Sequence, residues 1–314
     1  MYTKYIKRRN KNISICVYEI MQRKVQMNSI KLKARAKINL GLDVLCKRED
    51  GYHEVRMVMQ TIGLYDRIIM KKIKEPEIKI VTNLSFLPVN ENNLVHKAAK
   101  MLIDEFNIKE GVSIDLNKFI PVAAGMAGGS SDAASVLYGM NRLFHLNLTM
   151  EELMVRGVHI GADVPYCILR GTALAEGIGE KLTKLKPMPK CYIVVAKPPI
   201  NVSTKLVYEN LDMKGIEDHP DIDGIINAIE AEDIYAIAQK LENVLEKVTI
   251  PLYPVIAKIK NDMKSNGAIN AIMSGSGPTV FGMFDDYEVA MKCIDVLKKA
   301  DDARQIYITE TYNL

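Results

Sequence analysis

Residues 121–132 read Pro121-Val122-Ala123-Ala124-Gly125-Met126-Ala127-Gly128-Gly129-Ser130-Ser131-Asp132. Three glycines and two serines thus stand directly before a segment with helical periodicity, which predicts a helix over residues 131–144. Glycines allow a backbone to turn its N–H groups inward, and the first turn of a helix adds unpaired donors and the positive end of its dipole. These residues therefore indicate an anion-binding loop, for which phosphate is the obvious guest.

The alternative for this loop is a flexible turn that only packs the helix closely, and composition alone does not separate the two. The spacing differs from both G-x-x-x-x-G-K-[ST] and G-x-G-x-x-G, which excludes a P-loop and a Rossmann dinucleotide site. A second cluster, Ser274-Gly275-Ser276-Gly277-Pro278-Thr279, lies between two apolar runs and by itself predicts a hairpin.

Strand and helix patterns mix along the chain without a regular β-α-β period. Residues 30–44 alternate as in a half-buried strand, and residues 55–62 and 67–72 predict two more strands. A helix is expected from Asn92 or Asn93 to Phe106, and residues 149–152 are a capping box that opens another. Later segments complete an α+β pattern, with strands at 191–196 and 304–308, a strand-loop-strand at 269–283, and helices at 222–245, 255–266 and 287–299.

The composition suggests three parts of the chain. Residues 181–190 (KLTKLKPMPK) place prolines and lysines between two apolar segments, so we expect a boundary there between an N-terminal domain, 29–185, and a C-terminal domain, 186–314. Residues 1–28 are a basic extension, expected to be disordered or to reflect an alternative start at Met21 or Met27. A short membrane-surface or RNA-binding arm is the alternative for this extension.

Charge and cysteine content exclude several classes of protein. Residues 1–27 hold seven Lys/Arg and one Glu, so the rest of the 314-residue chain holds 35 basic and 37 acidic side chains, a net charge of −2. This balance argues against a nucleic-acid partner. Five scattered cysteines argue against a disulfide framework or a zinc site and suit a reducing cytoplasm. The long uncharged stretch 265–284 is too rich in glycine for a membrane span.

One acidic residue, Asp163, stands within the apolar stretch Gly161-Ala162-Asp163-Val164-Pro165. Such an aspartate is most often a helix cap or a turn former. It could also act as a general base if a substrate hydroxyl lay within hydrogen-bond distance. The residues themselves leave both roles open.

Three separated blocks resemble, in order, the motifs of the galactokinase, homoserine kinase, mevalonate kinase and phosphomevalonate kinase (GHMP) superfamily. They are Ala36-Lys37-Ile38-Asn39-Leu40 with Asp50-Gly51-Tyr52-His53, then residues 121–133 with 161–165, then residues 274–279. The resemblance covers residue 29 to the end. It implies a two-domain α+β kinase fold, with an N-terminal domain like domain 2 of ribosomal protein S5 and a ferredoxin-like α/β sandwich at the C-terminus.

Within this superfamily, the blocks resemble the kinases that use ATP to phosphorylate the 2-hydroxyl of 4-diphosphocytidyl-2-C-methyl-D-erythritol, in the non-mevalonate route to isoprenoid precursors. The resemblance assigns the ATP phosphates to residues 121–131. It makes Asp163 the base that takes the hydroxyl proton, and Lys37 the charge that stabilises the attacking oxygen and the transferred phosphoryl group. From strand alternation alone, Lys37 would instead face solvent like Lys31 and Lys33. Mg²⁺ is expected mainly on ATP oxygens, with Ser130 as a candidate ligand.

The same resemblance implies an acceptor site. Asn39 matches a substrate-site asparagine, Tyr52 and His53 match a pair that stacks on and hydrogen-bonds to the cytosine base, and Thr204 and Tyr208 match a second cytidine wall. We expect the phosphoryl group to pass directly to a small-molecule acceptor, because no Ser/His or Cys/His constellation suggests a covalent phosphoenzyme. The expected location is the cytoplasm. The alternatives are another GHMP kinase, of homoserine or mevalonate type, or a non-catalytic nucleotide-binding sensor. The sequence does not indicate an oligomeric state.

Overall fold

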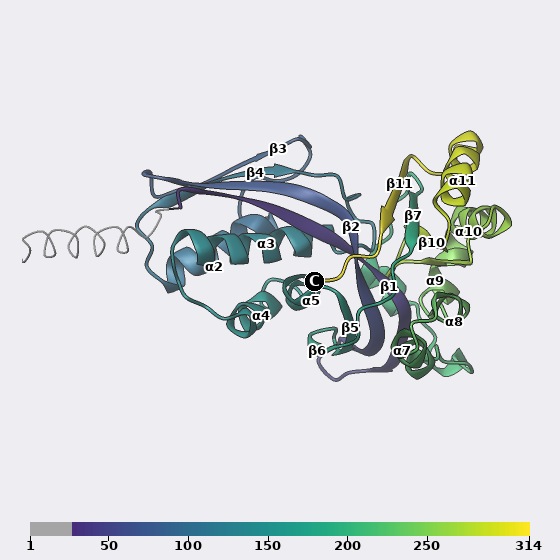
Figure 1. Ribbon diagram of the computed structural model, residues 1–314. Helices are drawn as coiled ribbons and strands as arrows, with labels where there is room; N and C mark the ends of the chain where they lie inside the picture. The colour runs from purple at the N-terminus through teal and green to yellow at the C-terminus, as the bar shows by residue number, and fades with distance from the viewer. Residues whose placement is uncertain (1–26) are drawn as a thin grey trace, which may run out of the picture.

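The computed structural model describes residues 27–314, and within them two β-sheets carry helices packed against each (Figure 1). In these residues the larger sheet has seven strands: β1 (Ser29–Lys47), β2 (His53–Ile73), β3 (Ile78–Thr82), β4 (Gly111–Asn117), β5 (Thr172–Gly177), β6 (Lys181–Lys184) and β8 (Glu242–Asn243). The smaller, antiparallel sheet has four, in the order β11 (Gln305–Glu310), β7 (Tyr192–Lys197), β10 (Val280–Phe284) and β9 (Asn270–Met273). The predicted basic extension lies almost wholly outside the described residues.

The long strands β1 and β2 pair antiparallel over most of their length. β2 is one continuous strand, so the sequence-based prediction of two strands separated after residue 62 was wrong. The pairing shifts register between Arg35 and Lys37, where β2 holds extra residues as a bulge. A bulge interrupts the side-chain alternation and bends the strand without ending the ladder, which explains the missed continuity.

The centre of β1 is buried on both faces. Ile38 and Leu40 belong to the apolar cluster that extends into the smaller sheet, whereas Leu42 and Val44 belong to the cluster that includes the helices of the larger sheet. Lys37 directly precedes these residues and is only 5% exposed. Strand alternation alone predicted that Lys37 faces solvent, and that prediction was wrong.

Helices α2 (Leu94–Glu105) and α3 (Gly128–Leu143) lie side by side against the larger sheet (Figure 1). The Asn93 side chain accepts a hydrogen bond from the N–H of Val95, so the predicted cap of α2 is confirmed. The predicted capping box is also confirmed, because Thr149 and Glu152 exchange side-chain and backbone bonds at the start of α4 (Met150–Val158). The short helix α5 (Val164–Leu169), which follows α4, was not predicted.

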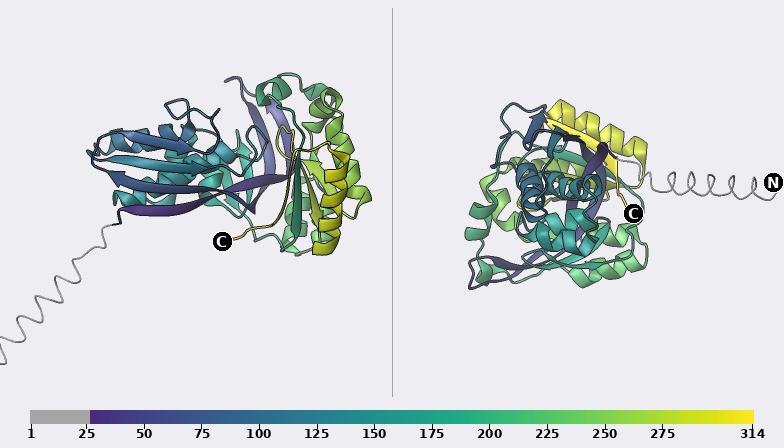
Figure 2. Two further views of the ribbon diagram at one scale, coloured as in Figure 1. Left: turned by 90° about the horizontal axis from the view of Figure 1, so that it is seen from above. Right: turned by 90° about the vertical axis from the view of Figure 1, so that its left-hand side faces the viewer.

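The smaller sheet packs against α10 (Val255–Ser265) and α11 (Tyr287–Ala300). The remaining helical segments are α6 (Thr204–Glu209), η1 (Met213–Gly215), α7 (Ile222–Glu230), α8 (Ile234–Gln239) and α9 (Glu246–Leu252). After β11 the chain returns to the larger sheet (Figure 2), where the Tyr312 N–H donates to the Thr61 carbonyl at 2.9 Å. The α+β prediction is confirmed by this arrangement. None of the helices within residues 27–314 combines the length and hydropathy needed to span a lipid bilayer.

Candidate active site

The predicted glycine loop leads into α3, which begins at Gly128, three residues before the predicted start. Its N-cap, Ala127, has a left-handed φ of 54° and makes no side-chain capping bond. The first N–H groups of a helix have no partner inside the helix, so those of Gly128 to Ser130 remain available as donors. Nine loop residues line a cavity of about 420 Å³, which we call the loop cavity: Pro121 to Gly125 and Ala127 to Ser130.

Two of the eleven predicted loop residues face elsewhere. Met126 is 1% exposed and packs in the core. The Ser131 hydroxyl donates to the Arg35 carbonyl at 2.6 Å, which fixes the start of α3 to β1. These two residues therefore support the loop and do not line its cavity.

The second glycine cluster connects β9 to β10, which pair as the predicted hairpin. It also contacts the first loop, because the Ser274 hydroxyl donates to the Gly125 carbonyl at 2.9 Å. Gly125 has a φ of +70°, and a Cβ placed on it would lie 2.1 Å from the Ser274 carbonyl oxygen. Only glycine allows the two loops to approach this closely.

Lys37 and Asp163 lie together, with Nζ and Oδ2 3.9 Å apart. Asp163 occupies the N-cap position of α5, yet its side chain makes no capping bond and remains 32% exposed. The Lys37 ammonium donates to the Asn39 Oδ1 at 2.8 Å, and its backbone N–H donates to the Met126 carbonyl in the loop. The sequence left open a capping role for Asp163, but the geometry directs its carboxylate to Lys37.

A larger cavity, about 680 Å³, opens on the other side of this pair, and we call it the acceptor cavity. Tyr52, His53, Thr204 and Tyr208 all line it, together with Lys37 and Asp163. The rings of His53 and Tyr208 have centroids 5.1 Å apart and planes inclined by 40°. Asn39 does not line the cavity; it is fully buried and contacts Lys37.

Burial shifts the pKa of two of these rings. It raises the pKa of Tyr208, with a smaller contribution from the Asp163 charge. Burial, with a contribution from Lys47, lowers the pKa of His53 below its ordinary value of 6.5. Both rings are therefore neutral at pH 7, and a neutral imidazole presents one donor and one acceptor to a ligand.

The two cavities meet at four residues that line both: Gly125, Ser130, Asp163 and Thr204. The Thr204 hydroxyl hydrogen-bonds to that of Ser276 at 2.8 Å, which ties α6 to the second glycine cluster. A phosphoryl donor in the loop cavity and a hydroxyl acceptor in the larger cavity would thus approach each other beside Asp163. This is the arrangement that in-line transfer between two bound substrates needs.

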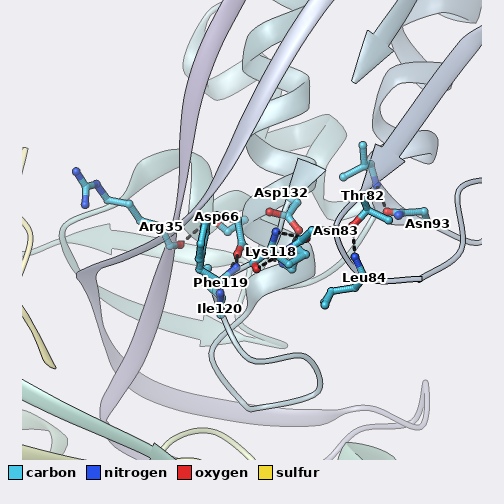
Figure 3. Close-up of polar contacts among 12 residues, drawn as sticks. Arg35, Asp66, Thr82, Asn83, Leu84, Asn93, Lys118, Phe119, Ile120 and Asp132 are labelled. Carbon is cyan, nitrogen blue, oxygen red and sulfur yellow. Dashed lines mark hydrogen bonds and ion pairs between the residues drawn. The ribbon is translucent and has the colours of Figure 1, made fainter. Parts of the chain in front are cut away.

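A buried ionic cluster under the loop was missed by the sequence reasoning (Figure 3). Lys118 contacts Asp132 with a Nζ–Oδ2 distance of 2.6 Å and also pairs with Asp66. Asp66 in turn accepts the backbone N–H groups of Phe119 and Ile120. Lys118 and Asp132 both line the loop cavity. The only sequence signal was that Asp132 closes the glycine segment and that Lys118 lies just before it.

Desolvation raises the pKa of the buried Asp132, and the nearby Asp66 carboxylate adds to this effect. Desolvation lowers the pKa of Lys118, but its pairs with Asp132 and Asp66 outweigh that effect and leave the pKa raised. The cluster therefore keeps Lys118 charged, and it holds the strand end before the loop against the first turn of α3.

Within residues 27–314 no group of three or more His, Cys, Asp or Glu side chains could enclose a metal ion. Ser130 lies where the two cavities meet, and no hydrogen bond of its hydroxyl is found in the described chain. A single hydroxyl at the edge of the loop cavity fits Mg²⁺, which usually keeps several waters and takes few protein ligands.

Comparison with known proteins agrees with this geometry. Residues 93–171 match the model of the GHMP kinases N terminal domain, and residues 225–303 match that of the GHMP kinases C terminal. A crystal structure of homoserine kinase from Cytophaga hutchinsonii, 19% identical, covers 91% of this chain and 95% of its own with a TM-score of 0.71, which shows the shared fold. The fold and the paired glycine loops define a GHMP kinase.

Closer relatives narrow the assignment. The 4-diphosphocytidyl-2-C-methyl-D-erythritol kinase of Lachnospira eligens is 66% identical over 91% of this chain and 99% of its own. That of Clostridium perfringens is 51% identical over 90% and 99%. A crystal structure of 4-(cytidine 5'-diphospho)-2C-methyl-D-erythritol kinase, 29% identical, covers 91% of this chain and all of its own with a TM-score of 0.79. The chain belongs to the 4-diphosphocytidyl-2-C-methyl-D-erythritol kinase family.

Proposed function

We propose that this protein transfers the γ-phosphoryl group of ATP to the 2-hydroxyl of 4-diphosphocytidyl-2-C-methyl-D-erythritol, in the cytoplasm. The observation that carries the proposal is the position of Asp163, 3.9 Å from Lys37 and in the wall of both cavities. The loop cavity takes ATP and the acceptor cavity takes the cytidylylated alcohol. Residues 29–185 form the domain that carries the loop, and residues 186–314 form the second domain.

Asp163 acts as the general base. Its carboxylate has no capping bond to compete for its lone pairs, so it can accept the proton of a hydroxyl placed in the acceptor cavity. Lys37 is the fixed positive charge beside it, and Asn39 holds its ammonium at 2.8 Å. As the hydroxyl oxygen becomes negative and attacks phosphorus, a preorganised cation stabilises the developing charge with little reorganisation.

The nucleotide phosphates bind to the free N–H groups at the start of α3, where the helix dipole favours negative charge. Ser130 is the protein ligand we assign to Mg²⁺, and the other ligands are phosphate oxygens and water. The bound ion would neutralise charge on the phosphates. The chain itself orients the nucleotide through its loop backbone and excludes water with the closely packed second glycine cluster.

The cytidine end of the acceptor binds between Tyr52, His53 and Tyr208. Tyr52 is 59% exposed, so its ring is available to stack on a flat base, and the inclined rings of His53 and Tyr208 line the same cavity. Because its lowered pKa keeps His53 neutral, this residue can both donate to and accept from the edge of cytosine. Thr204 and Tyr208 extend from the same short helix toward this site.

The test is ADP release by the purified protein with ATP, Mg²⁺ and a panel of alcohols. The panel compares 4-diphosphocytidyl-2-C-methyl-D-erythritol with the same alcohol phosphate lacking the cytidylyl group, with homoserine and with mevalonate. We expect turnover with the cytidylylated alcohol alone, and a new phosphomonoester signal by phosphorus NMR. Equal turnover with homoserine or mevalonate, or none with any alcohol, would contradict the proposal.

A further inference from the structure

A third cavity, about 350 Å³, lies beside the N-terminal half of β1, away from the active site. Within residues 27–314 this half of β1 pairs with β2 alone, because β8 reaches no further than Gly41 and Leu42. The strand therefore presents an open edge, and we call the hollow beside it the edge cavity. Its other walls come from α3, from the first residue of α4, from the end of α5 and from the C-terminal residues.

The edge cavity is strongly positive. Lys31, Lys33, Arg35 and Arg170 line it, and among the residues that the structure describes no acidic side chain does. No ion pair of these four side chains is found in the described chain, and the terminal carboxylate of Leu314 pairs with none of them, although cations elsewhere on the sheets do pair, such as Arg56 with Asp223. Arg35 donates to the Gly63 carbonyl at 3.1 Å and Lys33 lies over the Tyr65 ring, but neither contact neutralises a charge. An excess of one sign of charge in a hollow concentrates the field and attracts a counter-ion.

The remaining wall is apolar and aromatic, with Leu32, Tyr138 and Ile168. The Arg35 guanidinium lies 3.5 Å from the ring centroid of Tyr312, which also lines the cavity. Arg170 has a φ of +62° and a ψ of −179°, a combination nearly confined to glycine that costs a residue with a Cβ roughly 1 to 3 kcal/mol and that is concentrated at ligand sites. A compact anion with a flat or apolar part suits both walls.

We infer that the edge cavity is a second ligand site, which binds an organic phosphate or diphosphate and acts on the active site from outside it. Three structural links join the two sites. β1 carries Arg35 two residues before Lys37. Asp163 is the N-cap of α5 and Arg170 is its C-cap. The Arg35 carbonyl accepts a hydrogen bond from the Ser131 hydroxyl at the start of α3. An anion that bridges Arg35 and Arg170 therefore fixes β1 relative to α5, and with them the Lys37–Asp163 separation.

The first test measures binding without turnover. The full chain is saturated with a non-hydrolysable ATP analogue, which occupies the loop cavity, and is then titrated calorimetrically with phenyl phosphate and with inorganic phosphate. We expect one phenyl phosphate per chain, bound more tightly than inorganic phosphate because of the aromatic wall, with an affinity that falls as salt is added. No binding at this stage would overturn the inference.

Two paired substitutions locate the site. Lys33→Gln/Arg170→Gln should weaken phenyl phosphate binding at least tenfold, whereas Lys298→Gln/Lys299→Gln, which removes the same charge from the exposed face of α11, should change it less than twofold. If the first pair impairs folding, Lys31→Gln/Lys33→Gln alters only exposed strand positions and should weaken binding in the same direction. Equal affinities in the edge-cavity and control variants would refute the assignment.

The second test concerns coupling, and this part alone rests on the proposed function. At saturating ATP and acceptor, phenyl phosphate should change kcat at least twofold without raising the KM for ATP, and the change should disappear in Lys33→Gln/Arg170→Gln. An effect confined to the KM for ATP would show competition at the loop and overturn the coupling. A protein inactive on the cytidylylated alcohol that still binds phenyl phosphate would refute the proposed function and leave this site standing.

Discussion

Replacing Asp163 by asparagine separates the chemistry at the active site from its architecture. Asparagine preserves the shape of the side chain but cannot take a proton, so kcat should fall by about 10²- to 10⁴-fold, the usual contribution of general acid-base catalysis. At about 1.36 kcal/mol per tenfold change, the barrier rises by about 2.7 to 5.5 kcal/mol.

The same change removes the partner of Lys37 at 3.9 Å. Coulomb's law with an effective dielectric constant of about 20 sets an upper limit of about 4 kcal/mol for that pair. Because the Asp163 side chain is 32% exposed, solvent screening reduces the effect on stability to about 1 kcal/mol. With an unfolding entropy of about 2.1 cal/mol/K per residue, that corresponds to a fall in Tm of about 1 to 2 °C for a chain of 314 residues.

The assay combines steady-state kinetics, a thermal melt and calorimetric titration with a non-hydrolysable ATP analogue. The matched control is Asp104→Asn, which breaks the exposed Lys100–Asp104 pair on α2 and should leave kcat unchanged. A folded Asp163→Asn protein that binds the analogue and retains near wild-type kcat would refute the base assignment. A fall in Tm of more than about 10 °C would instead show that Asp163 has mainly a structural role.

Three further predictions concern the acceptor cavity and the loops. Tyr52→Ala should raise the KM for the cytidylylated alcohol by an amount equivalent to about 1 to 3 kcal/mol of binding free energy, the range for base stacking on an aromatic ring. The KM for ATP should stay nearly unchanged, and equal effects on both would count against stacking. Because the pKa of His53 is lowered, the KM for the cytidylylated alcohol, measured at saturating ATP, should stay constant from pH 8 to 6.5 and rise only at lower pH. The His53→Asn variant should not show this rise at low pH. Gly125→Ala should raise the KM for ATP at least tenfold, since the new Cβ would meet the Ser274 carbonyl. The control is Gly171→Ala: Gly171 also has a positive φ, but the space around it is open, so this change should lower only Tm. Similar ATP KM values in the two variants would argue against close loop packing.

Features that depend on a few neighbouring residues could be predicted from the sequence. The caps at Asn93 and Thr149, the helix after the glycine segment and the hairpin around the second glycine cluster were confirmed. Each depends on backbone groups being satisfied within about four residues, which the local residue types specify. The family motifs are also local, which explains why the kinase family could be inferred before the fold was known.

The surroundings of those motifs depend on the tertiary structure. Lys37 looked solvent-facing because periodicity describes one strand, whereas its burial follows from two apolar clusters that cover both faces of β1. Asn39 contacts Lys37 and does not line the acceptor cavity, since the register shifts in β1 decide where each side chain points. The Lys118–Asp66–Asp132 cluster joins three distant segments. Such contacts are selected by burial and charge pairing between remote parts of the chain, and no pattern within a short window carries that information.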